Sequence, residues 1–456
     1  TDLEIGPALA RSQLSRWNRL DEEFARLEER DARIGTSRED RQEPSLGALD
    51  ARLLRLQERI ARTIGTPLLQ ELANPTTQIA KWFSSSARAA LDLIESYESQ
   101  LSFAPAAAQQ TSAMSAERIQ ADLSTYLQRR FPELSEQPIK ALRIMPGGRS
   151  KRTVIFELEH NPVLPSRLVL RSDLVAGQMG TSVADEYPLL TRLHAAGLPV
   201  PQPLLLETDP SILNGMFMIV NEIENAEIAG EPFGEERRLR PQGSHMGPDF
   251  GHQVAQFLAR LHAVPIAPGA VVNPHEEIRQ LYEQWRTIEP MPRSIGLELG
   301  FAWLLSHPLS EDRPRALVHG DFGCHNILTR GGELVAVLDW ELAGEADPAA
   351  DFGDSKRMLL DALLPWDQFV QHYVAAGGDP RACDLHAVRY YSMRRFVKHG
   401  ATTALLRHYF LTGARDDILA AGASWHYFHR LQQYCARELM DALDAGAPDN
   451  EPDLRR

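Results

Sequence analysis

The sequence has few cysteines and no long apolar run. Only three of its 456 residues are cysteines, and they lie far apart, at Cys324, Cys383 and Cys435. A disulfide framework and a CxxC metal site are both excluded, so we expect reduced thiols in a reducing compartment. No uninterrupted apolar stretch approaches the ~18 residues that span a bilayer, and the opening TDLE lacks the order of a signal peptide. We therefore predict a cytoplasmic protein with no membrane partner.

The sequence also has fewer basic residues than acidic ones. The chain has 48 lysines and arginines against 62 aspartates and glutamates, which gives a formal net charge of −14. A general nucleic-acid binder needs a concentrated basic surface, so the composition argues against nucleic acid as a partner. At roughly 100–200 residues per domain, the length predicts two or three domains, each large enough to bury a core.

The first hundred residues predict packed helices. Apolar residues recur every three or four positions over 14–27 and again over 49–64. A third helix is predicted over 86–99, followed by an Ala/Gln/Ser-rich linker over 104–115. No group of catalytic residue types occurs there, so we interpret residues 1–110 as a helical cap or dimerisation region rather than a second active site. A homodimer through these helices is the predicted assembly.

Residues 115–225 predict a small β-rich lobe that follows a helix ending near Pro132. Short β-type runs predict five strands, and a helix over 184–196 is inserted after the third. The predicted strands are 139–145, 153–159, 167–171, 204–206 and 217–223. Five strands with one inserted helix form a small antiparallel lobe.

Residues 226–445 predict a larger and mostly helical lobe. A helix is predicted over 250–262, and a hairpin-like section over 327–340 interrupts the helical pattern. A β-rich lobe followed by a helical lobe places a ligand in the cleft between them. The predicted fold class is therefore α+β with two lobes.

The most informative segment is VHGDFGCHNIL, followed by VLDWE. Asp321 precedes Asn326 by five positions, which is the D-x-x-x-x-N spacing of a kinase catalytic loop. In such a loop the aspartate accepts the substrate hydroxyl proton and the asparagine holds Mg²⁺. Asp339 follows a short apolar strand, where a carboxylate can reach the metal that bridges the ATP phosphates. The pattern therefore predicts one base and two metal ligands.

This segment resembles the aminoglycoside phosphotransferase and choline-kinase-like superfamily, whose signature is HGDxxxxN followed by an aspartate in a D-W/F-E context. The resemblance implies a protein-kinase-like fold and transfer of the γ-phosphoryl group of ATP, with Mg²⁺, to a hydroxyl of a small molecule. It also implies that Asp321 is the catalytic base and that Asn326 and Asp339 are magnesium ligands. His319 would begin the catalytic loop, and Asp351, the last residue of GEADPAAD, would brace it.

A single aspartate of this kind would be interpreted as a helix cap or a turn residue. Four sequence features occur together here: His-Gly-Asp, the asparagine five positions later, Asp-Trp-Glu, and the Asp-Pro-x-x-Asp run. Their joint occurrence makes the catalytic interpretation the better one. Cys324 and His325 lie inside the loop but match no ligand set, so we interpret them as local packing residues.

A glycine loop upstream predicts a phosphate-binding site. In PGGRS, Gly147, Gly148 and Ser150 occupy a turn where backbone amides can approach phosphate oxygens. Paired glycines are also common in hairpin turns, so the signal depends on its place in the order of motifs. Many members of the superfamily carry a G-G-x-S-N-like loop, and Lys151 stands here in place of the asparagine. Its side chain either adds charge at the phosphates or points into water.

Two further segments complete the predicted nucleotide site. Arg171 ends the strand LVLR and occupies the position of the β3 lysine of kinases, which neutralises the α- and β-phosphates. Its predicted partner is Glu186, although a surface helix charge is the alternative interpretation. The hinge is predicted at Asn221, Glu222 and Ile223, whose backbone would hydrogen-bond the adenine edge. The choice of ATP over GTP comes from the resemblance alone.

A basic helix over 389–399 in this acidic protein gives a clue to the identity of the acceptor substrate. Arg389, Arg394 or Arg395, and Lys398 can share one broad side of it. Such a face could meet an anionic acceptor, such as a hydroxy acid or a hydroxyacyl thioester, and not a polycationic aminoglycoside. The alternatives are a solvated helix face paired with surface carboxylates, and an aminoglycoside or other antibiotic as the acceptor.

Two other function classes remain as alternatives. A nucleotide-binding pseudokinase with a regulatory partner would be expected to have lost Asp321, Asn326 or Asp339, and all three are present. A protein kinase would carry His-Arg-Asp and Ala-Pro-Glu segments, which this chain lacks, and its metal aspartate would stand in Asp-Phe-Gly, whereas Asp339 stands in Asp-Trp-Glu. We therefore predict a small-molecule kinase.

Overall fold

The computed structural model describes residues 115–136, 138–145, 151–173, 181–230, 248–266, 273–287 and 295–411, with isolated positions between 413 and 442. The predicted N-terminal helices and the glycine loop with Gly147, Gly148 and Ser150 lie outside these residues. The described residues form two compact units, of which the first takes those between 109 and 271 and between 310 and 391. The second takes those between 272 and 309 and from 392 onward. The domain boundaries predicted from the sequence stay predictions.

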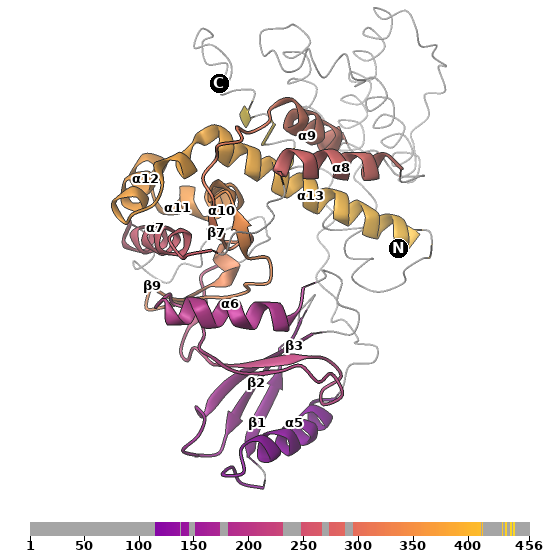
Figure 1. Cartoon of the computed structure of the whole chain (residues 1–456), viewed down its shortest axis with the longest axis vertical. Helices are drawn as coiled ribbons and strands as arrows, with labels where there is room; N and C mark the ends of the chain where they lie inside the picture. Colours follow the sequence, from indigo (N-terminus) through magenta and orange to yellow (C-terminus); the bar gives the residue numbers. More distant parts are fainter. Residues whose placement is uncertain are drawn as a thin grey trace, which may run out of the picture. The chain divides into compact units, whose positions relative to one another are not determined.

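The first unit contains a five-stranded antiparallel sheet with the strand order β1-β2-β3-β5-β4 (Figure 1). Its strands are β1 (Ile139–Ile144), β2 (Lys151–Leu158), β3 (Arg167–Asp173), β4 (Pro203–Glu207) and β5 (Phe217–Asn221). Each of the five predicted strands overlaps one of these, and their ends agree to within about two residues, the usual uncertainty of strand ends.

The two faces of this sheet differ in chemistry because successive side chains point to opposite sides. Leu168 and Leu170 of β3 pack in one core cluster with Ile119 and Leu123 of helix α5 (Ala116–Arg130). Arg171, the next residue on β3, belongs to the opposite face. The face toward α5 is therefore apolar, and the other face carries charged side chains.

Helix α6 (Val183–Ala195) follows the third strand, as predicted. The hydroxyl of Ser182 caps its first turn and accepts a hydrogen bond from the Ala184 backbone N–H at 3.1 Å. Gly197, with φ +73°, follows its last turn in the left-handed conformation that commonly ends a helix. The capped first turn fixes the position of Glu186, which is buried with 3% of its surface exposed.

The rest of the first unit is mainly helical, with short strands. Its helices are α7 (Pro248–His262), α10 (Ala349–Ser355), a π-helical turn (Lys356–Leu360), α11 (Asp361–Leu363), α12 (Trp366–Ala375) and two 3₁₀ turns (Cys324–Asn326 and Pro380–Cys383). Three strands, β6 (Glu227–Ile228), β8 (Ile327–Arg330) and β9 (Glu333–Val337), form one small sheet, and β7 (Ala316–Val318) pairs with β10 (Gly344–Ala346). The predicted hairpin corresponds to β8 and β9.

The second unit contains α8 (Pro274–Thr287), α9 (Ile295–Ser306) and most of α13 (Leu385–Leu411), whose first turns belong to the first unit. The indole N–H of Trp285 donates to the carboxylate of the buried Glu298 at 2.9 Å, which joins α8 to α9. Among the residues that the structure describes, no helix is both long enough and apolar enough to cross a membrane.

Candidate active site

The predicted catalytic loop starts directly after β7, and His319 joins it to the end of β9. The Asp321 backbone N–H donates to His319 Nδ1 at 3.2 Å, so this ring nitrogen must be an acceptor. The proton therefore resides on Nε2, which lies 2.9 Å from the Leu338 carbonyl oxygen and donates to it. His319 is completely buried. Its two ring nitrogens thus connect the two segments that carry Asp321 and Asp339.

Gly320 is required by the backbone of this loop. Its φ of +79° lies in the left-handed region, and a Cβ built on it would lie 2.4 Å from the Leu342 carbonyl oxygen. A side chain at this position would collide with backbone that cannot move away independently. The close approach gives a physical reason for the glycine of the HGD motif.

Asp321 and Asn326 lie at the two ends of one hydrogen-bonded loop. The Asn326 side-chain amide donates to the Asp321 backbone carbonyl at 2.9 Å and is 3.3 Å from Asp321 Oδ2. Asn326 is buried, whereas 23% of the Asp321 side chain is exposed. The spacing of five is therefore the length of a loop that closes on itself and leaves the carboxylate accessible.

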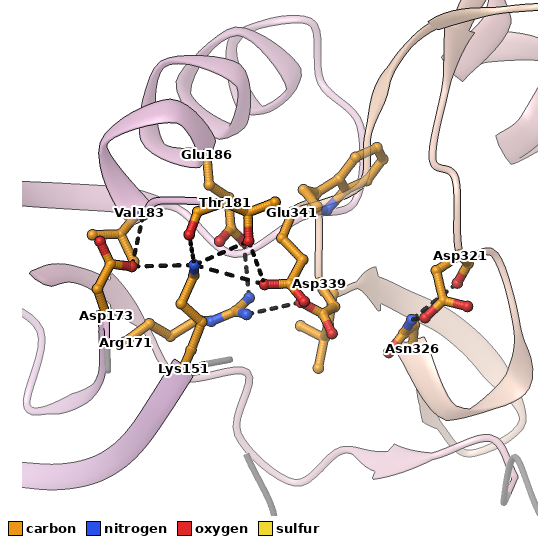
Figure 2. Close-up of polar contacts among 12 residues, drawn as sticks. Lys151, Arg171, Asp173, Thr181, Val183, Glu186, Asp321, Asn326, Asp339 and Glu341 are labelled. Carbon is orange, nitrogen blue, oxygen red and sulfur yellow. Dashed lines mark hydrogen bonds and ion pairs between the residues drawn. The ribbon is translucent and has the colours of Figure 1, made fainter. Parts of the chain in front are cut away.

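Asp339 follows β9 and lies beside the same loop. The Leu338 backbone N–H donates to the Asn326 backbone carbonyl at 2.8 Å, which places the end of β9 against the loop. Asp339 has φ +65°, which is uncommon for a residue with a side chain, and 37% of its side chain is exposed. Figure 2 shows Asp321 and Asn326 together, with Asp339 on the segment between them and the charged residues of the sheet.

These side chains fit a magnesium ion that arrives with a nucleotide. Because the Asn326 amide nitrogen donates to Asp321, its oxygen is the atom available for coordination, beside the Asp339 carboxylate. Among the described residues, no group of three or more His, Cys, Asp and Glu side chains could hold a metal ion. Mg²⁺ is commonly held by one or two protein oxygen ligands with phosphates and water, so this small donor set suits Mg·ATP.

Arg171 connects the sheet, α6 and Asp339. Its Nη1 lies 2.8 Å from Glu186 Oε1, and its Nη2 lies 2.8 Å from Asp339 Oδ1 (Figure 2). Burial opposes the charge on Arg171, but the two carboxylates hold its pKa above the usual value. Burial raises the pKa of Glu186, against the attraction of Arg171. The interpretation of Glu186 as a surface helix charge is wrong, because its side chain is buried in this ion pair.

Asp351 lies beneath the catalytic loop and is completely buried. Its carboxylate accepts hydrogen bonds from the backbone N–H groups of His319 and Gly320, both at 2.9 Å. His262 Nε2 lies 3.2 Å from Oδ2 of the same carboxylate, and the other ring nitrogen of His262 lies 2.8 Å from the Tyr373 hydroxyl. Burial alone would raise the pKa of Asp351, but these hydrogen bonds and the nearby histidines hold it below its ordinary value of 3.8.

We expect Asp351→Asn to lower the free energy of unfolding by about 3 kcal/mol near neutral pH, because it removes a buried acceptor of several hydrogen bonds. The folded-state pKa of Asp351 lies below its unfolded value of 3.8. Its stabilisation is therefore fully present above about pH 4 and is lost as the pH falls through the folded-state pKa. Urea unfolding of the wild type and of Asp351→Asn should show that the difference in their free energies of unfolding becomes smaller in acid.

Asp361→Asn is the matched control for this variant, since Asp361 is an exposed aspartate on α11. It should leave the free energy of unfolding nearly unchanged at every pH. An equal difference between the wild type and Asp351→Asn at all pH values would contradict the assignment of a charged, buried Asp351.

Two residues differ from their sequence-based interpretation. His325 is not only a packing residue, because its Nε2 lies 3.3 Å from Asp321 Oδ2. Cys324 is buried, in agreement with a packing role. Lys151 does not point into water: only 3% of its surface is exposed, and its ammonium lies among oxygen atoms of three segments. The contacts of Lys151 have no local sequence signal, because an ion pair across the fold leaves no periodicity, whereas His325 lies only four residues after Asp321.

The predicted hinge follows β5. The backbone N–H groups of Asn221 and Glu222 donate to the carbonyl oxygens of Gln202 and Arg167, both at 3.1 Å. The Glu222 carboxylate forms an ion pair with Arg167 at 2.6 Å. Both N–H groups are thus used within the sheet, and a donated hydrogen bond to adenine stays a prediction for Ile223.

The basic helix predicted to meet an anion is α13. Arg394 and Lys398 both form ion pairs with Glu277 of α8, and Lys398 Nζ lies 2.5 Å from Glu277 Oε1. Although burial raises the pKa of Glu277, these two cations hold it below the usual value. This pairing gives Arg394 and Lys398 a structural role. Anion binding by α13, including Arg389 and Arg395, stays a prediction.

The profile of the phosphotransferase enzyme family, APH, matches residues 141–391, which is more than half of the 456-residue chain. The chain belongs to this family. Membership confirms the resemblance to aminoglycoside phosphotransferases, and it confirms the predicted enzyme class and the kinase-like α+β fold. The matched region contains every described side chain of the site that surrounds Asp321.

The chain is similar to parts of curated proteins and to solved structures with different names. The chain is similar to acyl-CoA dehydrogenase family member 11 of Gallus gallus, with 26% identity over 250 residues. The match covers 51% of this chain and 30% of that protein. The chain is also similar to hygromycin-B 4-O-kinase of Escherichia coli, with 33% identity over 103 residues, which are 21% of this chain and 25% of that one. Choline kinase LicA of Streptococcus pneumoniae aligns in structure with 69% of this chain and 98% of its own, with 14% identity and a TM-score of 0.47. The chain spans less than a third of the length of both curated relatives.

Proposed function

We propose that this chain transfers the γ-phosphoryl group of ATP, with Mg²⁺, to a hydroxyl group of a small molecule. The observation that carries the proposal is the hydrogen-bonded loop that holds Asp321 and Asn326 together and lies against the residue before Asp339. Hydrogen bonds within this loop, and between it and Leu338, support the proposal that Asp321 is the base and that Asn326 and Asp339 are the two oxygen ligands. This arrangement matches the roles that phosphoryl transfer requires.

Each of these side chains has a distinct part in the proposed reaction. The Asp321 carboxylate accepts the proton of the acceptor hydroxyl and aligns that hydroxyl with the phosphoryl group. Asn326 and Asp339 would hold Mg²⁺ through oxygen atoms, and the ion would neutralise charge on the phosphates. Arg171 would contribute positive charge beside the same phosphates while it remains paired with Glu186. All three residues that a pseudokinase would be expected to lose are present.

For the acceptor we propose a hydroxyacyl thioester. The support is the name of the Gallus gallus relative, which describes an acyl-CoA dehydrogenase and of which this chain matches 30%. Two activities joined in one chain can act in succession on one class of metabolite, and a hydroxylated acyl thioester offers the hydroxyl that a kinase needs. An aminoglycoside is the second candidate, because the Escherichia coli relative is named hygromycin-B 4-O-kinase.

An acceptor panel tests both parts of this proposal. ADP release would be measured with Mg·ATP and hydroxyacyl-CoA thioesters, with hygromycin B, with choline, and with unhydroxylated acyl-CoA of matched chain length as the control. We expect turnover with hydroxylated thioesters and none with the matched controls. Turnover with hygromycin B alone would contradict the acceptor class and leave the kinase function in place. ADP release that no acceptor increases would contradict the proposed function.

A further inference from the structure

Lys151 is a buried cation at the first position of β2. Its ammonium lies 3.1 Å from Asp173 Oδ1 and 3.7 Å from Glu341 Oε2, and it donates to the Thr181 backbone carbonyl at 2.5 Å. Only 3% of its surface is exposed. A buried lysine is costly unless its charge is matched and its hydrogen bonds are satisfied. These contacts meet both conditions, so the position of the ammonium is defined by the fold.

The sheet register places Lys151 on the same face as Arg171. In the antiparallel pair β2·β3, Lys151 lies opposite Asp173, and Thr153 lies opposite Arg171. Opposite residues share a face, and so do residues two apart on one strand. Both cations therefore project from the charged face of the sheet. Figure 2 shows them directed toward the same group of carboxylates.

Asp173 connects Lys151 to the first turn of α6. Its carboxylate accepts a hydrogen bond from the Val183 backbone N–H at 3.0 Å and another from the Ser182 hydroxyl at 2.7 Å. A carboxylate at a helix N-terminus stabilises the first turn by satisfying its free N–H groups. That turn leads to Glu186, the partner of Arg171. Lys151 thus contacts the residue that anchors α6.

On its other side, Lys151 contacts the segment that carries Asp339. Glu341 lies two residues after Asp339, and its carboxylate also accepts a hydrogen bond from the Thr181 hydroxyl at 3.2 Å. The start of α6 and the segment 339–341 are therefore joined by Lys151 and Thr181. Arg171 joins the same two segments a second time, through Glu186 and Asp339.

Two separate links restrain this segment better than one. A single ion pair between Arg171 and Asp339 fixes a distance but leaves the segment free to rotate about that contact. Asp339 also has φ +65°, a conformation that surrounding contacts must maintain. The second link, from Lys151 to Glu341, holds the chain two residues beyond Asp339 and so limits its rotation.

We propose that Lys151 is a positioning residue for the metal ligand Asp339, acting through Glu341 and the start of α6. The inference rests on the proposed function, since it presupposes that Asp339 binds Mg²⁺ with the nucleotide. It assigns to the lysine of β2 a role separate from that of Arg171 on β3. Outer contacts of metal ligands commonly change metal affinity or activity by about 10- to 100-fold when they are removed.

The competing role for Lys151 is a direct contact with phosphate. The two roles differ in their dependence on the metal. Loss of a positioning residue for Asp339 weakens binding of Mg·ATP and leaves binding of metal-free ATP nearly unchanged. Loss of a phosphate contact weakens both. The ratio of the ATP dissociation constant in EDTA to that with excess Mg²⁺ therefore separates them, without requiring turnover.

Calorimetry on the whole chain would measure this ratio for the wild type and for Lys151→Met, Lys151→Arg, Glu341→Gln and Lys140→Met. Lys140 is the matched control, because it forms an exposed ion pair with Glu157 on the same sheet. We expect the ratio to fall about tenfold in Lys151→Met and in Glu341→Gln, to recover in part in Lys151→Arg, and to stay unchanged in Lys140→Met. If Lys151→Met does not fold, Glu341→Gln and Lys151→Arg give the same test.

Three results would overturn the inference. Equal loss of affinity with and without Mg²⁺ in Lys151→Met would indicate a phosphate contact. A lower melting temperature with an unchanged ratio would indicate a purely structural role. A normal ratio in Glu341→Gln would remove the link to Asp339. A wild-type ratio near one would instead contradict the proposed metal role of Asp339, so failure of the proposed function is recognised separately.

Discussion

Asp321→Asn is expected to lower kcat by about a thousandfold while the affinity for Mg·ATP stays within about threefold of the wild type. The amide has the shape of the carboxylate, so its oxygen can still accept the hydrogen bond that Asn326 donates to Asp321 at 3.3 Å. The amide cannot take up the proton of the substrate hydroxyl, and the substitution removes a charge that helps to align that hydroxyl. Initial rates of ADP release and calorimetry with Mg·ATP would measure the two effects.

The matched control for this variant is Asp312→Asn, because Asp312 is an exposed aspartate that accepts a hydrogen bond from Ser310. It should retain wild-type turnover. Near-normal kcat in Asp321→Asn would contradict its assignment as the base. Loss of Mg·ATP binding in the same variant would point instead to a role in nucleotide binding.

Asp339→Asn is expected to weaken Mg·ATP binding and to lower kcat by about a hundredfold or more, because it removes the only carboxylate among the two proposed metal ligands. The shape of the side chain is kept, so a contact with Arg171 can persist through the amide oxygen. Titration of activity with Mg²⁺ should show a higher metal requirement, and calorimetry should show the loss only when Mg²⁺ is present.

Asp361→Asn serves again as the control, since this exposed residue pairs with Lys356 at a distance of 2.7 Å in a surface contact. Unchanged affinity for Mg·ATP and an unchanged metal requirement in Asp339→Asn would contradict a metal-ligand role. An equal loss of affinity in EDTA would indicate that the variant disturbs Arg171 rather than the metal.

Local patterns predicted the sheet well because its strands are short runs of apolar and β-branched residues bounded by turn signals. The apolar core residues Leu168 and Leu170 lie on one face of β3 and the charged Arg171 on the other, as period-two alternation requires. The π-helical turn Lys356–Leu360 was not predicted. A one-residue insertion in a helix changes the apolar repeat too little to be recognised in a short segment.

The pairing of Asp321 with Asn326 could also be predicted, because it is local in the sequence. The spacing to Asn326 is set by a hydrogen bond across five residues, whereas Gly320 is needed for a close approach to the backbone of Leu342, which is distant in the sequence. The surroundings of Lys151 could not be predicted. Lys151 meets Glu341 only when the chain has folded, and a sequence without an alignment gives no signal of such a distant pair.

Transfer of a labelled phosphoryl group tests the central claim most directly. The whole chain would be incubated with Mg·ATP labelled in its γ-phosphoryl group and with each acceptor of the panel, and products would be identified by mass spectrometry. The wild type should move the label to a hydroxyl of at least one small-molecule acceptor, and Asp321→Asn should not. Label released only as inorganic phosphate, at equal rates in both proteins, would contradict the account.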